Sequence, residues 1–153
     1  MIEFESSVKI ARSPDQVFAI LADFEAYLAR WADGPVAARR TEGDGGAGTR
    51  FEITARVGPL RVRAPYEITE YEPPARLGGR GTAGPVNFDE VYSLAVEGPA
   101  TLVTQVIHAQ PRGPFRLLQG IVERQLRRLI AADLARLKGL VETEMADETT
   151  QRP

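Results

Sequence analysis

Apolar and polar residues alternate over residues 2–10 and over several later segments between residues 49 and 109. In the clearest of these segments, residues 49–57, arginine, glutamate or threonine separates each apolar position from the next. This period of two is typical of half-buried strands. Short turns such as Gly58-Pro59 join neighbouring segments, so the pattern predicts an antiparallel sheet of about seven strands.

Two short helices are expected directly after the first strand. Ser13 is a suitable N-cap, Pro14 occupies the first helical position, and Gln16 completes a capping box. A second short helix is expected over residues 24–31, and Gly34-Pro35 ends it. We expect the two helices to form a connector that packs against the sheet.

A helical period with one apolar stripe predicts a single long helix over residues 115–145. The stripe consists of large apolar residues, namely Phe115, Leu118, Val122, Leu126, Leu129, Leu137 and Leu140. Neither one helix nor a meander of strands can bury its apolar face alone. We therefore predict an α+β fold in which a curved sheet grips the helix and leaves a cavity. The chain is predicted to form one domain over residues 1–145, with a polar, disordered tail over residues 146–153.

Composition excludes several classes of function. The chain has 153 residues, no cysteine and a single histidine, so disulfides and thiolate or multi-histidine metal sites are excluded, and we expect no cofactor. The balance of 19 basic and 21 acidic residues argues against a nucleic-acid partner. No apolar run is long enough to span a bilayer and no signal-peptide pattern is present, so we expect a cytoplasmic protein. The oligomeric state is left open, and a homodimer is among the alternatives.

Apolar residues on the expected inner face of the sheet and on the helix stripe are the candidates for a ligand-binding wall. They are Phe51, Ile53, Val62, Tyr66, Phe88, Tyr92, Leu118, Val122 and Leu129. The apolar character of each residue is also explained if the side chain only fills the core. Strands wrapped around one helix nonetheless tend to leave unfilled volume, as small barrels do.

Two carboxylates are candidates for catalysis or for ligand binding. Asp133 lies in the middle of the apolar stripe, where an unpaired carboxylate is costly to bury. The alternative is that the helix bends and Asp133 reaches water or an arginine. Glu90 shares a face with Phe88 and Tyr92, and an inward orientation is expected to raise its pKa. A slip of this strand by one residue turns Asp89 inward instead.

Three further side chains and one basic segment have a functional and a structural explanation. His108 is a candidate general base at a pocket mouth, although a lone histidine is more often a surface residue. Tyr66 and Tyr92 can donate a hydrogen bond to a ligand carbonyl, or can simply bond to the backbone. Residues 124–128 contain three arginines, which form either a solvated face or a contact with an anionic lipid surface or a carrier-protein phosphopantetheine.

Three motifs resemble the START/Bet v 1-like (SRPBCC) superfamily, and in particular its polyketide cyclase/dehydrase-type members. They are Val8-x-Ile10-x-x-Ser13-Pro14-x-x-Val17-Phe18-x-x-Leu21-x-Asp23-Phe24, then Tyr66-Glu67-Ile68-Thr69-Glu70-Tyr71-Glu72-Pro73-Pro74-Ala75-Arg76-Leu77, and Leu134-x-x-Leu137-Lys138-x-x-Val141-Glu142. The resemblance covers roughly residues 4–142 and departs from the usual pattern at Pro99-Ala100-Thr101. It implies a helix-grip fold, but its residues are caps, turns and packing positions, so they specify no chemistry.

The preferred interpretation is a protein that binds a hydrophobic small molecule, such as a lipid or a polyketide, in an internal cavity between sheet and helix. The first alternative is a polyketide aromatase/cyclase that catalyses aldol closure and dehydration through general acid and base groups drawn from Asp133, Glu90, His108 and the two tyrosines. The second is a lipid-shuttling or interaction module. The sequence leaves open whether the protein is an enzyme.

Overall fold

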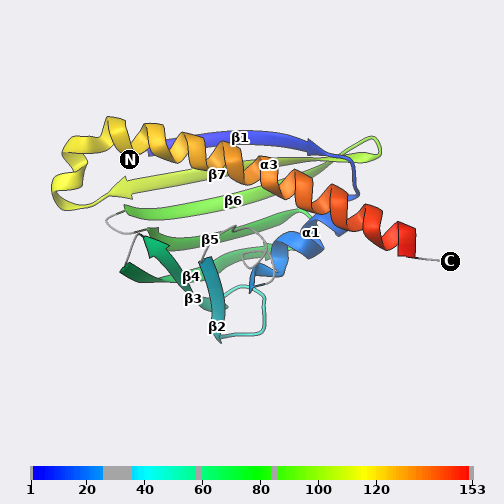
Figure 1. The fold of residues 1–153 in the computed structure, drawn as a ribbon, viewed down its shortest axis with the longest axis horizontal. Coiled ribbons are helices and arrows are strands. Elements are labelled where there is room, and N and C mark those ends of the chain that lie inside the picture. The colour runs from blue at the N-terminus through cyan, green and yellow to red at the C-terminus, as the bar shows by residue number, and fades with distance from the viewer. Residues whose placement is uncertain (1, 26–35, 58–59, 84–85, 152–153) are drawn as a thin grey trace.

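The computed structural model describes residues 2–25, 36–57, 60–83 and 86–151 (Figure 1). Over these residues the chain forms seven strands, one helix after the first strand and one long C-terminal helix. The strands are β1 (Ile2–Ile10), β2 (Val36–Glu42), β3 (Arg50–Val57), β4 (Leu60–Glu72), β5 (Arg76–Ala83), β6 (Val86–Glu97) and β7 (Ala100–Pro111). The helices are α1 (Pro14–Ala22), the 3-10 helix η1 (Gly113–Leu118) and α3 (Gln119–Gln151).

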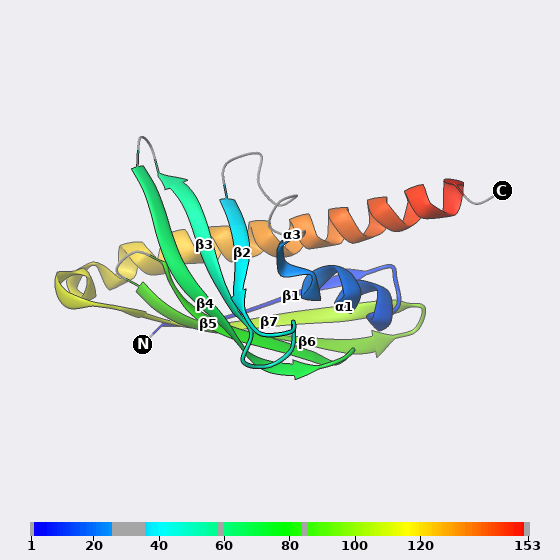
Figure 2. The same ribbon diagram turned by 90° about the horizontal axis from the view of Figure 1, so that it is seen from below.

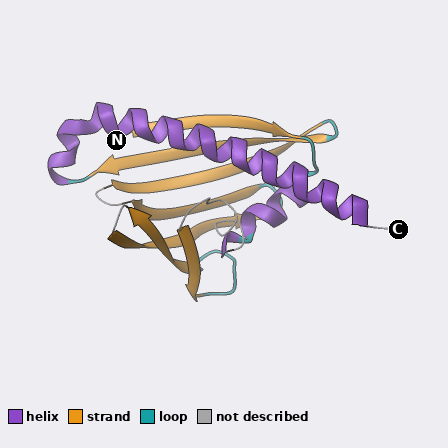
Figure 3. Cartoon of the chain, viewed as in Figure 1, coloured by secondary structure: helices purple, strands orange, loops and turns teal. Residues whose placement is uncertain are grey.

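The strands form one curved antiparallel sheet in the order β1-β7-β6-β5-β4-β3-β2. Short connections explain this order, because five of the six neighbouring pairs are consecutive in sequence and only β1 and β7 are not. Both helices lie on the inner side of the curve, with α3 running along β1 (Figures 2 and 3). The predicted α+β helix-grip architecture is therefore confirmed.

The first helix begins where the capping residues predicted it. The Ser13 hydroxyl accepts a hydrogen bond from the Gln16 backbone N–H at 3.4 Å, and the Gln16 side chain accepts one from the Ser13 N–H at 3.2 Å. The second short helix was expected over residues 24–31, and most of that range lies outside the described residues.

The long helix differs from its predicted bounds at both ends. Its entry is a 3-10 turn, because Gly113 has a positive φ of 60° and Pro114 follows it. At its other end α3 continues to Gln151, although residues 146–153 were expected to form a disordered tail. No glycine or proline lies between Val141 and Gln151, so nothing in the local sequence stops the helix.

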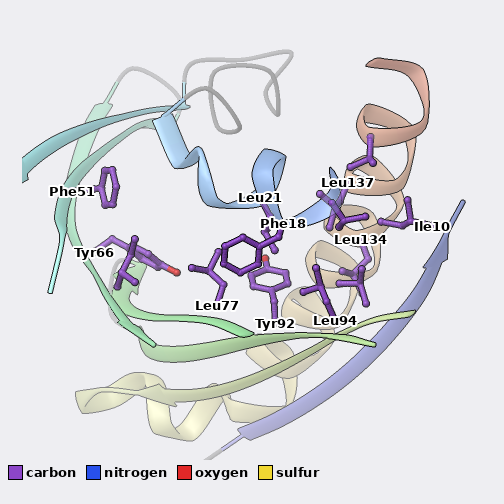
Figure 4. Packing of buried hydrophobic residues seen from close by; sticks show 14 residues of the cluster. Ile10, Phe18, Leu21, Phe51, Tyr66, Leu77, Tyr92, Leu94, Leu134 and Leu137 are labelled. Carbon is purple, nitrogen blue, oxygen red and sulfur yellow. The ribbon is translucent and has the colours of Figure 1, made fainter. Parts of the chain in front are cut away.

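The larger of the two described core clusters lies at the end of the sheet that α1 covers, and a smaller one lies toward the other end, with Ile2, Phe4, Val86, Ile107 and Ala109. Ile10, Val103 and Leu137 have no exposed surface in the larger cluster, and Leu134 and Leu137 of α3 point toward Ile10 and Leu94 in Figure 4. The second half of α3 is therefore packed against β1, β6 and β7. The N–H of Ala11 and the ammonium of Lys138 both bond to the Glu142 carboxylate, which ties this part of the helix to the end of β1.

Candidate functional site

A tyrosine lies across a glycine-rich strand on the inner face of the sheet. Tyr66 on β4 pairs with Gly81 of β5, and its hydroxyl extends over Gly79 to the next strand, β6. It donates a hydrogen bond of 2.6 Å to Oε1 of Glu90. A Cβ atom at Gly79 would overlap the Tyr66 hydroxyl, so only glycine leaves room for this side chain.

Glu90 has a second hydrogen-bond partner on β7. The Gln105 amide donates from Nε2 to Glu90 Oε2 at 3.1 Å and to the Tyr92 hydroxyl at 2.8 Å. Tyr66, Glu90, Tyr92 and Gln105 therefore form one connected group, called here the inner polar cluster. Three strands supply it: β4, β6 and β7.

Burial changes the acid–base properties of this cluster. The pKa of Glu90 is raised, chiefly because desolvation disfavours its charge, and the hydrogen bonds from Tyr66 and Gln105 offset part of that effect. The pKa of Tyr66 is raised well above 10.0 by its own burial and then by the charge of Glu90 and the hydrogen bond to it. Tyr66 is thus held as a hydrogen-bond donor, while Glu90 can change protonation state closer to neutral pH than an ordinary carboxyl group.

One acceptor in the cluster has no donor among the described residues. Gln105 has no exposed surface, both of its amide hydrogens are used, and its Oε1 atom accepts no hydrogen bond within the described part of the chain. An unsatisfied buried acceptor typically costs about 1–3 kcal/mol, so native structures rarely keep one. A group that donates a hydrogen bond to Oε1 would remove this cost.

Several side chains around the cluster are only half-buried although they point inward. Val8 and Ser6 on β1 share the face of the buried Ile10, and Phe88 on β6 shares the face of Glu90. Ser6, Val8, Phe88 and Glu90 all keep accessible surface. The described side chains therefore do not fill the inner face around Glu90.

A separate hollow of about 670 Å³ lies over the outer face of the sheet. Two rows of paired residues that cross the strands line this hollow. Along β4 and β6 they lie one residue before and one residue after the inward-pointing Tyr66 and Phe88, so both rows point outward. The rows are Arg50, Glu67, Arg80, Asp89 and His108, and Glu52, Pro65, Thr82, Asn87 and Gln110. Ion pairs such as Arg80–Glu67 at 2.9 Å neutralise much of its charge. This hollow is not the cavity predicted between helix and sheet, which stays a prediction.

The predicted wall residues have different positions. Phe51, Tyr66 and Tyr92 are buried on the inner face, and Ile53 and Phe88 are half-buried there. Leu118 lies in η1 and is 46% exposed, because the 3-10 turn removes it from the stripe of α3. The side chains of Val62, Val122, Leu129 and Asp133 lie outside the described part of the structure, so their predicted roles stay predictions.

Two of the three titratable candidates, Glu90 and His108, lie on opposite faces of the sheet. Glu90 points inward, whereas Asp89 is exposed, so the strand has the favoured register. His108 pairs with Asp89 across β6 and β7, and its Nε2 lies 3.3 Å from Oε2 of Glu3 on the outer face. Glu90 and His108 therefore do not share a site.

Sequence reasoning missed Gln105 and the role of Gly79. Both had a signal. Gln105 interrupts the inward-facing series of Val103, Ile107 and Ala109 with a polar residue. Gly78-Gly79 lies inside a strand, where glycine often marks the close approach of another group.

Two further kinds of site can be assessed for the described residues. Within ranges 2–25, 36–57, 60–83 and 86–151, no group of three histidine, aspartate or glutamate side chains is placed to hold a metal ion. No helix in that same part of the chain is long and apolar enough to cross a membrane.

The gripping sheet and its inner polar cluster define a helix-grip protein with a polar group enclosed on its inner face. The chain belongs to the polyketide cyclase / dehydrase and lipid transport family, whose family model matches residues 1–142. Among curated proteins, no sequence matches this chain.

Three solved structures illustrate the fold. A protein of Thermus thermophilus is 20% identical with a TM-score of 0.77, over 94% of this chain and 99% of its own. The ZhuI aromatase/cyclase of Streptomyces sp. R1128 is 17% identical with a TM-score of 0.74, over 94% and 95%. Norcoclaurine synthase of Thalictrum flavum, solved with a transition-state analogue, is 13% identical with a TM-score of 0.72, over 94% and 96%. At these identities the likeness establishes the fold alone.

Proposed function

We propose that the protein binds a hydrophobic small molecule that carries a hydrogen-bond donor, such as a phenol or an enol. The ligand lies between the inner face of the sheet and α3, with its donor on the inner polar cluster. The observation that carries this proposal is the buried Gln105 Oε1 atom, which accepts no hydrogen bond from the described residues. It belongs to the same amide group whose Nε2 donates to the Glu90 carboxylate.

The hydrogen-bond inventory of the cluster selects the ligand group. The Tyr66 hydroxyl and both amide hydrogens of Gln105 are already used within the cluster. What remains is acceptor capacity on Gln105 Oε1 and on the Glu90 carboxylate. At these two acceptors, Gln105 Oε1 and the Glu90 carboxylate, a ligand carbonyl finds no donor, whereas a ligand hydroxyl complements them.

The surroundings of the cluster suit an apolar ligand body. Phe51 and Phe88 flank Tyr66 on the inner face, and Phe24 stacks on Tyr66 at a centroid distance of 4.7 Å. Ligand sites typically combine apolar walls with a few polar groups that fix orientation. The family description, with its mention of lipid transport, supports a hydrophobic ligand.

A matched pair of ligands tests this proposal. Calorimetric titration compares 2-naphthol with 2-methoxynaphthalene, which has a similar shape but no donor. We expect 2-naphthol to bind about fivefold more tightly, since one net hydrogen bond contributes on the order of 1 kcal/mol. Gln105→Met removes one of the two acceptors at similar volume and should reduce the preference. Asp89→Asn, on the exposed face of the same strand, is the matched control and should keep it. Equal affinities of the wild type for both compounds would refute the proposal.

Acid–base catalysis is a second candidate because of one observation. Glu90 has a raised pKa and contacts the Tyr66 hydroxyl, and a carboxyl group that titrates nearer to neutral pH suits general acid–base work. The test is proton–deuterium exchange at the α-carbon of an aryl ketone, followed by NMR in D₂O. Catalysis requires that exchange be faster with the wild type than with Glu90→Gln. Identical exchange rates for the wild type and Glu90→Gln would contradict catalysis by Glu90.

A further inference from the structure

One end of the molecule carries exposed apolar residues on a projecting turn. η1 and the first turn of α3 extend beyond the ends of β6 and β7, at the end opposite the C-terminus (Figure 1). There Leu117 is 89% exposed, Ile121 62% and Leu118 46%. Isolated exposed leucines are ordinary, but three within five residues on one projecting turn are not. These three residues are called here the apolar tip.

Basic residues surround the apolar tip. Between residues 98 and 132 the sequence contains five arginines and one acidic residue, Glu123. Glu123 is already neutralised, because Arg127 donates to it at 3.0 Å. Arg116 directly precedes Leu117 of the tip and is exposed. The tip and the first turn of α3 therefore carry more basic than acidic residues on a chain whose net charge is −2, while Glu3 and Glu5 of β1 lie beside Arg127 further along the helix.

The arginines follow the tip on the same side of the helix. Ile121, Arg124 and Arg128 are spaced by three and four residues, so they share one face of α3, and all three are exposed. At the rise of an α-helix, the two arginines lie about 4.5 Å and about 10 Å along the axis from Ile121. Helices that bind membrane surfaces bury their apolar residues by about 5–10 Å, with basic residues at the headgroups.

We propose that the apolar tip docks on an anionic lipid surface, with Leu117 and Ile121 inserted among the acyl chains and Arg124 and Arg128 among the headgroups. Charge complementarity favours this occupant over a second copy of the chain. A two-fold interface places the same patch on both sides and would bring the arginines of the two copies together. This docking surface is independent of the proposed ligand site, since none of its residues belongs to the inner polar cluster.

Vesicle co-sedimentation tests the proposal with two defined lipid mixtures. One is phosphatidylcholine alone, and the other is phosphatidylcholine and phosphatidylglycerol at three to one. We expect the protein to partition at least about tenfold more strongly to the anionic vesicles, and less strongly when NaCl is raised from 50 to 500 mM. Leu117→Ser with Ile121→Ser should reduce binding to anionic vesicles about tenfold or more, and Arg124→Gln with Arg128→Gln should remove the preference for them.

Matched controls separate the tip from general surface effects. Val96→Ser removes another exposed apolar residue, 73% exposed on the β6–β7 hairpin, and should leave vesicle binding unchanged. Thermal melts should be alike for all of these variants, because every altered side chain is exposed. The proposal is overturned if the wild type does not bind anionic vesicles, or if the Leu117→Ser, Ile121→Ser variant binds them as well as the wild type. Concentration-dependent self-association that this variant abolishes, without vesicle binding, would assign the tip to a second copy instead.

Discussion

The inner face of the sheet is packed differently under α1 and around Glu90. Under α1 and the second half of α3, Ile10, Val103 and Leu137 have no exposed surface, and the core there is apolar. Toward the middle of the sheet, Phe88 and Glu90 point inward and stay half-buried, and a polar cluster takes the place of packed aliphatic side chains. The comparison indicates a division of roles. The packed end supplies stability, whereas the region around Glu90 keeps polar groups and accessible surface that a ligand can use.

The largest stability effect is expected at the packed end. Leu137→Ala should lower the free energy of unfolding by about 2–5 kcal/mol, because it removes a fully buried side chain and leaves a cavity. Urea denaturation measures this change. Leu117→Ala removes the same atoms from an exposed position and should change the free energy by no more than about 0.5 kcal/mol. A similar small loss for both variants would contradict the assignment of the core to this end.

A smaller effect is expected where Tyr66 crosses β5. Gly79→Ala forces the Tyr66 hydroxyl away from Glu90 and should cost about 1–3 kcal/mol through overpacking. Gly139→Ala is the matched control, since its added methyl group meets no atom within 4 Å on α3, and it should stabilise the helix by about 0.5–1 kcal/mol. Thermal unfolding of the two variants should therefore shift in opposite directions. If Gly79→Ala is neutral, Tyr66 does not need the close approach that the structure shows.

The smallest effect concerns the contact that ties α3 to β1. The pKa of Glu142 is lowered, first by its hydrogen bond from Lys138 and then by the N–H of Ala11. Because the pKa is lower in the folded protein, the ionised carboxylate stabilises the fold at a pH above the unfolded-state pKa of about 4.3. This contribution is lost as the pH falls through the folded-state pKa. Glu142→Gln should cost at most about 1 kcal/mol at pH 7, since both side chains of the pair keep access to solvent.

Melts from pH 7 to pH 3 check this assignment. The difference between wild type and Glu142→Gln should shrink as the pH falls below about 4.3. A difference that does not depend on pH would show that the carboxylate charge plays no part in holding the helix.

Much of the fold was predictable because it depends on local patterns. Alternation predicted the strands, and the Ser13 capping box predicted the start of α1. The inner polar cluster was only half predictable. The face shared with Phe88 and Tyr92 predicted that Glu90 points inward, but its partners depend on the registers of β4, β5, β6 and β7 together. Those registers bring Tyr66 across Gly79 and place Gln105 beside Glu90, and no periodicity within a single strand contains that information.

The same limit explains the candidates that did not meet. His108 and Glu90 are on strands that pair, yet alternation places them on opposite faces, so a shared site required a register that the sheet does not have. The end of α3 lies beyond its predicted position for a different reason. Polar composition predicted a tail after Met145, but composition does not end a helix that lacks a glycine or proline.

The central claim is that the inner polar cluster serves a ligand and not stability, and Glu90→Gln tests it most directly. The pKa of Glu90 is raised in the folded protein. Below about pH 4.3 the carboxyl group is protonated in both the folded and the unfolded protein, so its charge costs no stability there. The full cost of the charge appears once the pH has risen above the folded-state pKa. The measurement is the difference in unfolding free energy between Glu90→Gln and wild type from pH 4 to pH 8. The account predicts that the variant is the more stable protein at pH 8 and that its advantage fades toward pH 4. A variant that is less stable at every pH would show that Glu90 braces the fold, and would contradict the claim.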